Sequence, residues 1–301
     1  MSLTFIGALA PRAESELSPP IGPPLQRAFV ERLARAYDRS SFDAVHVGQS
    51  ATSVDAAVLA QVALAVTDRV QVCVALPPNV VEPVAAARAV ATLAALYPGR
   101  VHATVPVACD VTRQAELAQI VHALWRARQP IDHDGAHFHL DRQWSVIRPD
   151  PAPQLAVQLG DPAAAAFADV VFVPADTPDR VASQVDGLRS DGSARFGIAV
   201  RPVVAADEWA ARELVRRLER RVPAWRVGDE HLLADLTRAH GGADPFVGTA
   251  DRLADRLREY VDAGVEVFQL RGFDPLADVD ALGQVAALVR EGGDGRAHRV
   301  A

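Results

Sequence analysis

The segment 67–101 constrains the fold more than any other part of the chain. It reads TDRVQVCVALPPNVVEPVAAARAVATLAALYPGRV: an apolar run at 70–76, a Pro-Pro-Asn turn, an alanine-rich stretch at 82–96, and a second apolar run from Val101. Short apolar runs bounded by turn residues are typical of buried strands. Because a parallel strand is buried on both faces, the run at 70–76 predicts an interior strand. The segment therefore predicts one complete βαβ unit.

The same alternation extends along the chain and predicts a barrel. Strands are expected at residues 3–9, 44–47, 70–76, 101–107, 154–159, 170–173, 196–204 and 265–270, and helices at 25–39, 55–66, 82–96, 113–128, 208–221, 250–263 and 279–290. Eight strands alternating with helices over roughly 250 residues favour a (β/α)8 TIM barrel over an open sheet. No Gly-x-Gly-x-x-Gly follows a strand, which argues against a Rossmann fold. Without repeats or low-complexity linkers, residues 1–301 are expected to form a single TIM-barrel domain.

Two segments interrupt the alternation. Residues 131–146 (IDHDGAHFHLDRQWSV) predict a short hairpin that turns at Asp134 and Gly135. Residues 222–248 form a long insertion before the eighth strand. Long insertions at the catalytic end of a barrel are usually lids or substrate loops, so this insertion is expected to be a lid.

The composition limits the partners of the chain. A net charge of −7 and a pI near 5.7 argue against nucleic acid and against an anionic membrane surface, both of which need a basic face. No apolar run approaches the ~20 residues that span a bilayer. The N-terminus lacks a basic segment ahead of its apolar run, so it predicts a first strand and not a signal peptide. Cys73 and Cys109 are not clustered. A cytoplasmic protein is the resulting expectation.

Three histidines in the expected hairpin raise the question of a metal site. His133, His137 and His139 lie within seven residues and could supply imidazole ligands. In a hairpin, however, His137 and His139 share one strand face while His133 lies across the turn, and no supporting carboxylate is placed by the sequence. No metal is therefore expected.

Several motifs resemble the luciferase-like flavin monooxygenases, most closely their alkanesulfonate monooxygenase branch. The similar segments are PVAAARAVATLAALYPGR at 83–100, FDAVHVGQS at 42–50, RFGIAVR at 195–201, FVGT with LADRLREYVDAG within 246–264, and FQLRGFDPL at 268–276. Each motif alone is weak, but together they follow the order and register of the family. The resemblance implies the bacterial luciferase type of TIM barrel, and the alkanesulfonate branch also carries the histidine hairpin on the outside of its barrel.

The resemblance also implies a function. It points to a cytoplasmic, dimeric enzyme that takes reduced FMN from a separate NAD(P)H-flavin reductase and uses O2 to oxidise a small organic substrate, with an anionic or sulfonate-like compound as one option. The implied catalytic residues are His240, a proton donor on the lid, and Arg201. Substrate binding is implied for Arg271, Phe273 and Gln49, and cofactor binding for Ala75, Pro106, Cys109, Gly160 and Asp161.

The sequence departs from the family where the chemistry is expected. The family holds the FMN phosphate after its fifth strand in a Gly-Gly-Ser-Ser-like turn, whereas this chain reads Leu159-Gly160-Asp161-Pro162. An aspartate repels a phosphate, and a proline removes an N–H donor. The loop after the fourth strand is about a dozen residues shorter than in the family. Phe273 stands in place of a tyrosine.

These departures leave three functional readings open. The first is the FMN-dependent monooxygenase, the second a non-catalytic luciferase-like subunit or paralogue that has lost flavin binding, and the third, weaker one a deazaflavin-dependent oxidoreductase. Arg201 and Arg271 could bind an anion together, or they could pair with Asp176 or Asp274 as structural ion pairs. The apolar helices 55–66 and 84–96 predict a homodimer or heterodimer.

Overall fold

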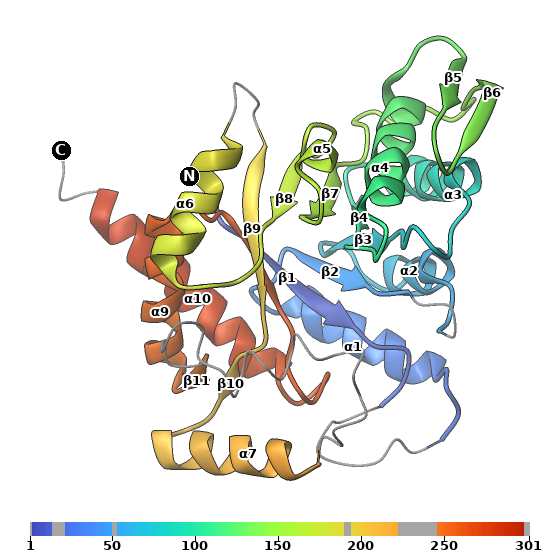
Figure 1. The fold of residues 1–301 in the computed structure, drawn as a ribbon. Coiled ribbons are helices and arrows are strands. Elements are labelled where there is room, and N and C mark those ends of the chain that lie inside the picture. The colour runs from blue at the N-terminus through green and yellow to red at the C-terminus, as the bar shows by residue number, and fades with distance from the viewer. Residues whose placement is uncertain (1, 14–21, 50–52, 190–193, 222–245, 298–301) are drawn as a thin grey trace.

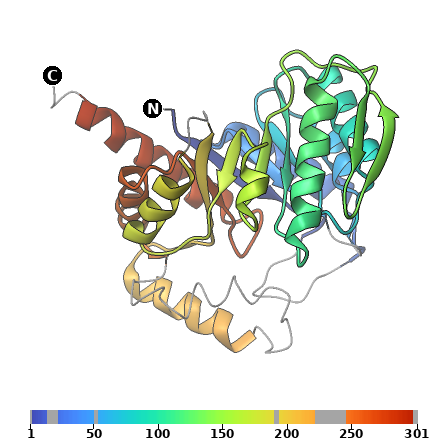
Figure 2. The same ribbon diagram turned by 45° about the horizontal axis from the view of Figure 1, so that its top comes forward.

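The expected TIM barrel is confirmed. The structure, a computed structural model, describes residues 2–13, 22–49, 53–189, 194–221 and 246–297. Eight parallel strands close in the spatial order β1-β12-β9-β8-β7-β4-β3-β2, and helices surround them (Figures 1 and 2). Every barrel strand therefore has a neighbour on both sides, which leaves no open sheet edge.

The barrel strands are β1 (Thr4–Leu9), β2 (Ala44–Val47), β3 (Gln71–Ala75), β4 (Val101–Val105), β7 (Leu155–Gln158), β8 (Val170–Phe172), β9 (Arg195–Val200) and β12 (Val267–Leu270). Four further strands form two small sheets: β5 (Ile131–Asp134) with β6 (His139–Gln143), and β10 (Val203–Val204) with β11 (Val247–Gly248). The helices are α1 (Arg27–Arg39), α2 (Ala56–Leu64), α3 (Pro83–Leu96), α4 (Val111–Arg126), α5 (Pro162–Ala165), α6 (Pro178–Leu188), α7 (Glu208–Arg221), α9 (Ala250–Asp262) and α10 (Val279–Ala297).

One expected strand ends early. The run 196–204 was expected to be continuous, but β9 ends at Val200 and a separate strand, β10, begins at Val203. Pro202 lies between them and has no N–H to donate to a neighbouring strand. The break turns the chain out of the barrel, so that β10 pairs with β11 and α7 follows beyond the end of the barrel (Figure 1).

Alternation along each strand separates two apolar regions. Outward side chains meet the helices: Tyr37 of α1, for example, packs directly against Gly7 of β1. Inward side chains form a small apolar layer inside the barrel, made of Ile6, Ala44, Ala156, Val170, Phe172 and Val267. Gly197 belongs to this inner face, because a Cβ there would lie 2.9 Å from the Phe172 ring and from the Val267 carbonyl oxygen. The described side chains thus pack the barrel interior at this level.

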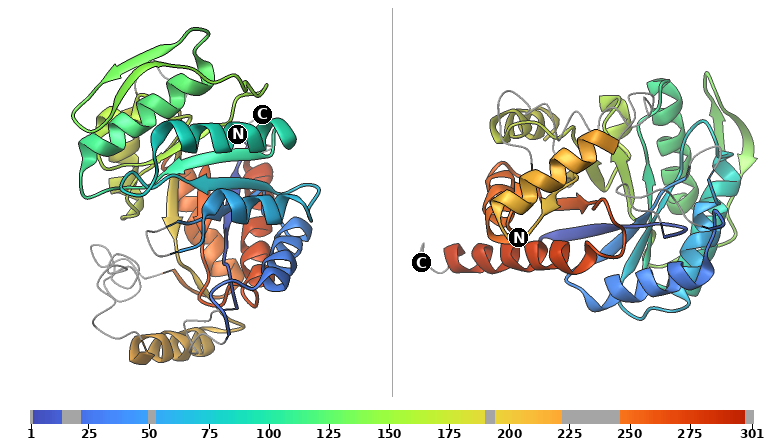
Figure 3. Two further views of the ribbon diagram at one scale, coloured as in Figure 1. Left: turned by 90° about the vertical axis from the view of Figure 1, so that its right-hand side faces the viewer. Right: turned by 90° about the horizontal axis from the view of Figure 1, so that it is seen from below.

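A buried carboxylate attaches the expected hairpin to α4. The Glu116 side chain accepts hydrogen bonds from the backbone N–H groups of Ala136 (2.8 Å), His137 (3.1 Å) and Phe138 (3.1 Å). These bonds lower the pKa of Glu116, against the opposing effect of its burial. The β5–β6 hairpin consequently lies along the outside of α4, near α3 (Figure 3).

The expected lid, residues 222–248, falls outside the described residues except for its last three.

Among the helices that the structure describes, none combines the length and apolar character needed to cross a bilayer.

Candidate active site at the C-terminal mouth of the barrel

The expected site residues gather at one end of the barrel. Except for Ala75 and His240, each of them follows the C-terminal end of a barrel strand: Gln49 after β2, Pro106 and Cys109 after β4, Gly160 and Asp161 after β7, Arg201 after β9, and Arg271 and Phe273 after β12. In TIM barrels this end carries the active site. Ala75 is the last residue of β3 and is buried, and His240 lies outside the described residues.

Arg201 is buried against an aromatic ring. Only 5% of the residue is exposed. Its guanidinium carbon lies 4.1 Å from the centre of the Phe273 ring, and Nη2 donates to the Gly272 carbonyl oxygen at 3.5 Å. A cation over an aromatic face is attracted by the ring quadrupole, more strongly when water is excluded. Arg201 and Phe273, assigned to different roles by the sequence, therefore form one unit.

A half-buried carboxylate, that of Asp278, lies close to this unit. Asp278 accepts hydrogen bonds from the backbone N–H groups of Phe273 (2.7 Å) and Asp274 (2.8 Å). Burial raises the pKa of Asp278, while these hydrogen bonds and the charge of Arg201 act in the opposite direction. The carboxylate thus fixes the loop that carries Phe273 and offsets part of the arginine's charge.

Arg271 stands beside Arg201 but faces water. Its backbone N–H donates to the carbonyl oxygen of Val200 at 3.2 Å, which continues the β9–β12 pairing, and the residue is exposed. The two arginines therefore follow the ends of neighbouring strands. Two guanidinium groups placed in this way can hold an anionic group between them.

A histidine inside the barrel, His46, has a pKa that burial and the charge of Arg271 lower. His46 lies on β2, at an inward position next to Cys73 of β3, whose Sγ is 2.7 Å from the Thr104 hydroxyl. Burial, together with the charge of Arg271, lowers the pKa of His46 to about 4. The ring is consequently neutral at neutral pH. Within the described part of the chain, its buried Nε2 atom has no hydrogen-bond partner.

Gln49 serves the start of a helix. Its side-chain oxygen accepts a hydrogen bond from the backbone N–H of Ala56 at 3.1 Å, at the first residue of α2. This contact fixes the loop after β2 at its far end. The carboxamide nitrogen remains the group that Gln49 could turn towards a substrate.

Gln114 joins the loops after β4 and β7. The side chain is fully buried, and its Nε2 donates to the carbonyl oxygens of Pro106 (3.0 Å) and Gln158 (2.6 Å). Its Oε1 is buried and has no partner among the described residues. A Cβ added to Gly160 would lie 2.6 Å from this oxygen, so the chain passes Gln114 closely only because residue 160 is glycine. Cys109, in the loop after β4, is exposed.

The turn after β7 does not fit a phosphate. Asp161 accepts a hydrogen bond from the backbone N–H of Ala163 at 2.8 Å and caps α5. Pro162 occupies the first helical position without an N–H, and α5 is only four residues long. A phosphate at this turn would meet the Asp161 carboxylate and few free N–H groups.

The hairpin histidines have separate partners. His133 Nε2 lies 3.4 Å from Glu116, His137 Nε2 3.0 Å from Asp110, and His139 Nδ1 2.8 Å from Asp134. No group of three potential metal ligands occurs among the described residues.

Two residues of this mouth were missed by the sequence reasoning. His46 had a visible signal, because a histidine at an inward position of the apolar strand AVHV needs an explanation. Gln114 had none, since a polar residue on a predicted amphipathic helix is usually exposed. Only the structure shows that it faces the loops after β4 and β7.

Comparisons with known proteins agree with the fold. The family model described as luciferase-like monooxygenase matches residues 8–105 and 103–267. An F420-dependent secondary alcohol dehydrogenase, solved with an F420-acetone adduct, is similar with a TM-score of 0.73 at 17% identity, covering 96% of this chain and 99% of that chain. EDTA monooxygenase from Chelativorans sp. BNC1 gives a TM-score of 0.73 at 17% identity, covering 97% and 94%. A riboflavin lyase solved with modified FMN and riboflavin gives 0.74 at 15% identity, covering 97% and 92%.

His46 makes stability depend on pH. Its pKa is about 4 in the folded chain and ~6.5 when unfolded, so the unfolded chain binds more protons in between. The stability that neutral His46 contributes is fully present above pH ~6.5 and is lost as the pH drops towards 4. Between pH 7 and pH 5, the free energy of unfolding measured with urea should fall by about 1–2 kcal/mol less in His46→Asn than in wild type. His139→Asn, at an exposed hairpin position, is the control. An unchanged slope in His46→Asn would contradict the assignment.

Proposed function

Because the chain belongs to the luciferase-like monooxygenase family, we propose that it is a flavin-dependent monooxygenase that oxidises a small organic anion at the mouth of its barrel. The pair Arg201 and Arg271 supports an anionic substrate. These residues follow adjacent strands and bring two positive charges to the mouth of a chain with a net charge of −7. Reduced FMN would come from a separate NAD(P)H-flavin reductase. The flavin, when bound, supplies the oxygen chemistry.

Each residue of the mouth has a part in this proposal. Arg271 and Arg201 bind the substrate's charge, and Phe273 supplies a ring against which Arg201 stays in place. Gln49 binds the substrate through its carboxamide nitrogen, and His240 on the lid donates a proton. Ala75, Pro106, Cys109 and Gly160 contact the flavin. Asp161 lies next to the flavin site, and its carboxylate, which caps α5, disfavours a flavin phosphate at the start of that helix.

A second candidate function has a specific observation in its favour. The Asp161 carboxylate occupies the N-terminus of α5, where the family resemblance implies a phosphate. A family member that kept the barrel and lost the flavin would be a non-catalytic partner subunit. A deazaflavin cofactor is a third candidate, and the F420-dependent dehydrogenase among the similar structures makes it worth including in a titration.

Asp161→Ser distinguishes these candidates. Serine also caps helices well, so the variant should lose little stability, and removing a like charge should strengthen FMN binding. The measurement is titration of both proteins with oxidised and reduced FMN and with F420. If neither protein binds any flavin below roughly 100 μM, a binding free energy of only ~5 kcal/mol, the non-catalytic subunit is the better description. Weaker FMN binding in the variant would place the phosphate elsewhere.

Arg271→Ala tests the substrate class. The residue is exposed, so its loss should leave the melting temperature unchanged while kcat/KM for an anionic substrate falls by about 1.5–3 kcal/mol in transition-state binding. Small alkanesulfonates and carboxylates, assayed by mass spectrometry with a flavin reductase present, are the probes. Arg180→Ala, an exposed arginine paired with Asp176 at 3.1 Å, is the control.

Arg201→Ala separates binding from structure. If Arg201 binds substrate, kcat/KM falls by a similar amount and the folded fraction retains the wild-type melting temperature. If the arginine only balances Asp278 and packs on Phe273, the melting temperature falls and activity per folded molecule is kept. The second outcome would remove Arg201 from the site.

We also propose that the protein is a dimer through α2 and α3. Both helices keep apolar side chains on their outer faces: Val58 on α2 is 67% exposed and Leu96 on α3 is 64% exposed. Such surplus apolar area is typical of an interface. Analytical ultracentrifugation at micromolar concentration, alone and with a candidate partner subunit, should give a dimer that Val58→Asp weakens. A strict monomer in both experiments would contradict the proposal.

A further inference from the structure

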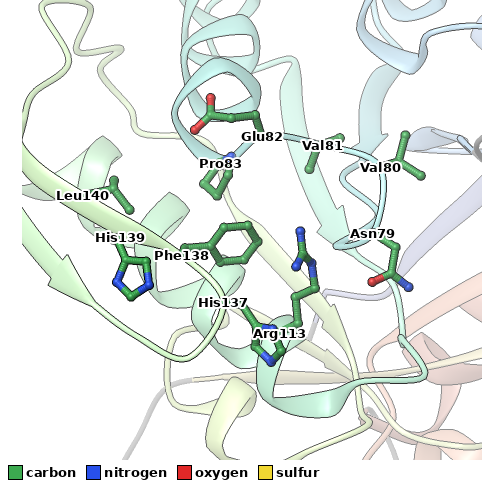
Figure 4. Close-up of a pocket in the computed structure, with 10 residues that line it drawn as sticks. All are labelled: Asn79, Val80, Val81, Glu82, Pro83, Arg113, His137, Phe138, His139 and Leu140. Atoms are coloured by element: carbon green, nitrogen blue, oxygen red, sulfur yellow. The ribbon is translucent and has the colours of Figure 1, made fainter.

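A separate cavity lies outside the barrel mouth. It has a volume of about 330 Å³ and opens between the loop after β3, the first turn of α4 and the β5–β6 hairpin (Figure 4). Asn79 and the start of α3 form one wall, and the hairpin residues from His137 onward form another. Arg113 of α4 projects between them (Figure 4). None of the expected flavin or substrate residues lines this space.

Arg113 is held in one orientation. Its Nε donates to the Pro78 carbonyl oxygen at 2.7 Å, and its guanidinium carbon lies 4.5 Å from the centre of the Phe138 ring. Among the described residues, neither terminal nitrogen of this guanidinium donates to a protein acceptor. Because Nε and the plane of the group are fixed, the two terminal nitrogens form a prearranged pair of donors at the cavity.

The neighbouring carboxylates are engaged elsewhere. Glu82 accepts hydrogen bonds from the backbone N–H groups of Val84 and Ala85 at the start of α3. Asp110 caps α4 through one oxygen and contacts His137 Nε2 through the other at 3.0 Å. Arg113 is therefore not balanced by an ion pair, although the chain as a whole is acidic. Glu82 also lines the cavity, but its carboxylate is bound to the start of α3 and forms no ion pair with Arg113 among the described residues.

We propose that this cavity binds a small oxyanion, a phosphate or carboxylate group, through the two terminal nitrogens of Arg113. A guanidinium with two parallel N–H groups matches the geometry of such an anion. The Asn79 carboxamide lies on the facing wall and is a further donor. The volume lies at the lower end of the range for small-molecule sites. The proposal does not depend on flavin binding or on monooxygenase activity.

The test is calorimetric titration of the flavin-free protein with inorganic phosphate and, separately, with acetate. Wild type should bind at least one of the two anions, and the binding that depends on Arg113 is separate from any binding at the barrel mouth. Arg113→Met keeps the length of the side chain and removes the charge, and it should weaken binding at least about tenfold, the effect of one lost charged hydrogen bond. Arg88→Met, an exposed arginine of α3, is the matched control and should bind like wild type.

Loss of binding in Arg113→Met, with binding kept in Arg88→Met, supports the proposal. The anion that binds then identifies the ligand as phosphate or carboxylate. Equal affinity in both variants, or no binding of either anion to wild type at ~10 mM, a binding free energy below ~3 kcal/mol, overturns it. Should Arg113→Met fail to fold, Asn79→Asp puts a negative charge at the exposed wall instead. That variant must also weaken binding, and unchanged affinity overturns the proposal.

Discussion

Closure of the barrel through its first strand is the constraint on which the rest of the structure depends. Ile6 of β1 pairs with Ala44 of β2 on one side and with Gln269 of β12 on the other, so the first and last strands of the barrel must pair for the sheet to close. Side chains reinforce this seam at the N-terminal end of the barrel: Asp43 accepts the Phe5 N–H at 2.7 Å, and Arg195 donates to the Thr4 hydroxyl at 2.9 Å. Because these contacts hold the N-terminal end of the barrel, the loops at the opposite end are free to vary in sequence without opening the sheet.

The mouth uses that freedom to collect positive charge. Burying a guanidinium is costly unless its surroundings compensate, and Arg201 has a ring on one side and the Asp278 carboxylate nearby. Arg271 then adds a second positive charge at the next strand, and its field helps keep His46 neutral. Two neighbouring cations repel each other, and an anion placed between them would relieve that repulsion. This arrangement of charge supports the proposed anionic ligand.

The sequence was sufficient for the barrel and insufficient for the site. All eight barrel strands were predicted, because buried parallel strands are apolar on both faces and stand out as runs such as residues 70–76. The single false extension, across Pro202, came from an apolar run that an absent N–H interrupts. Contacts between loops carry no such periodic signal. The passage of Gly160 past Gln114, and the attachment of the hairpin by Glu116, depend on which residues meet in space after the barrel has closed.

The turn after β7 and the cavity at Arg113 differ in one physical respect that bears on anion binding. At the turn after β7, the helix N-terminus is already neutralised by the Asp161 carboxylate, so an incoming phosphate would have to displace a group tied to it by the backbone. At Arg113 the positive charge lacks such an internal partner among the described residues, and its orientation is already fixed by Pro78 and Phe138. Binding at a fixed, unpaired donor loses little conformational entropy, whereas binding at a capped helix must first break the cap. An anion that meets this protein should therefore prefer a guanidinium site to the turn after β7, and a flavin held at the mouth would have to be bound by its ring more than by its phosphate.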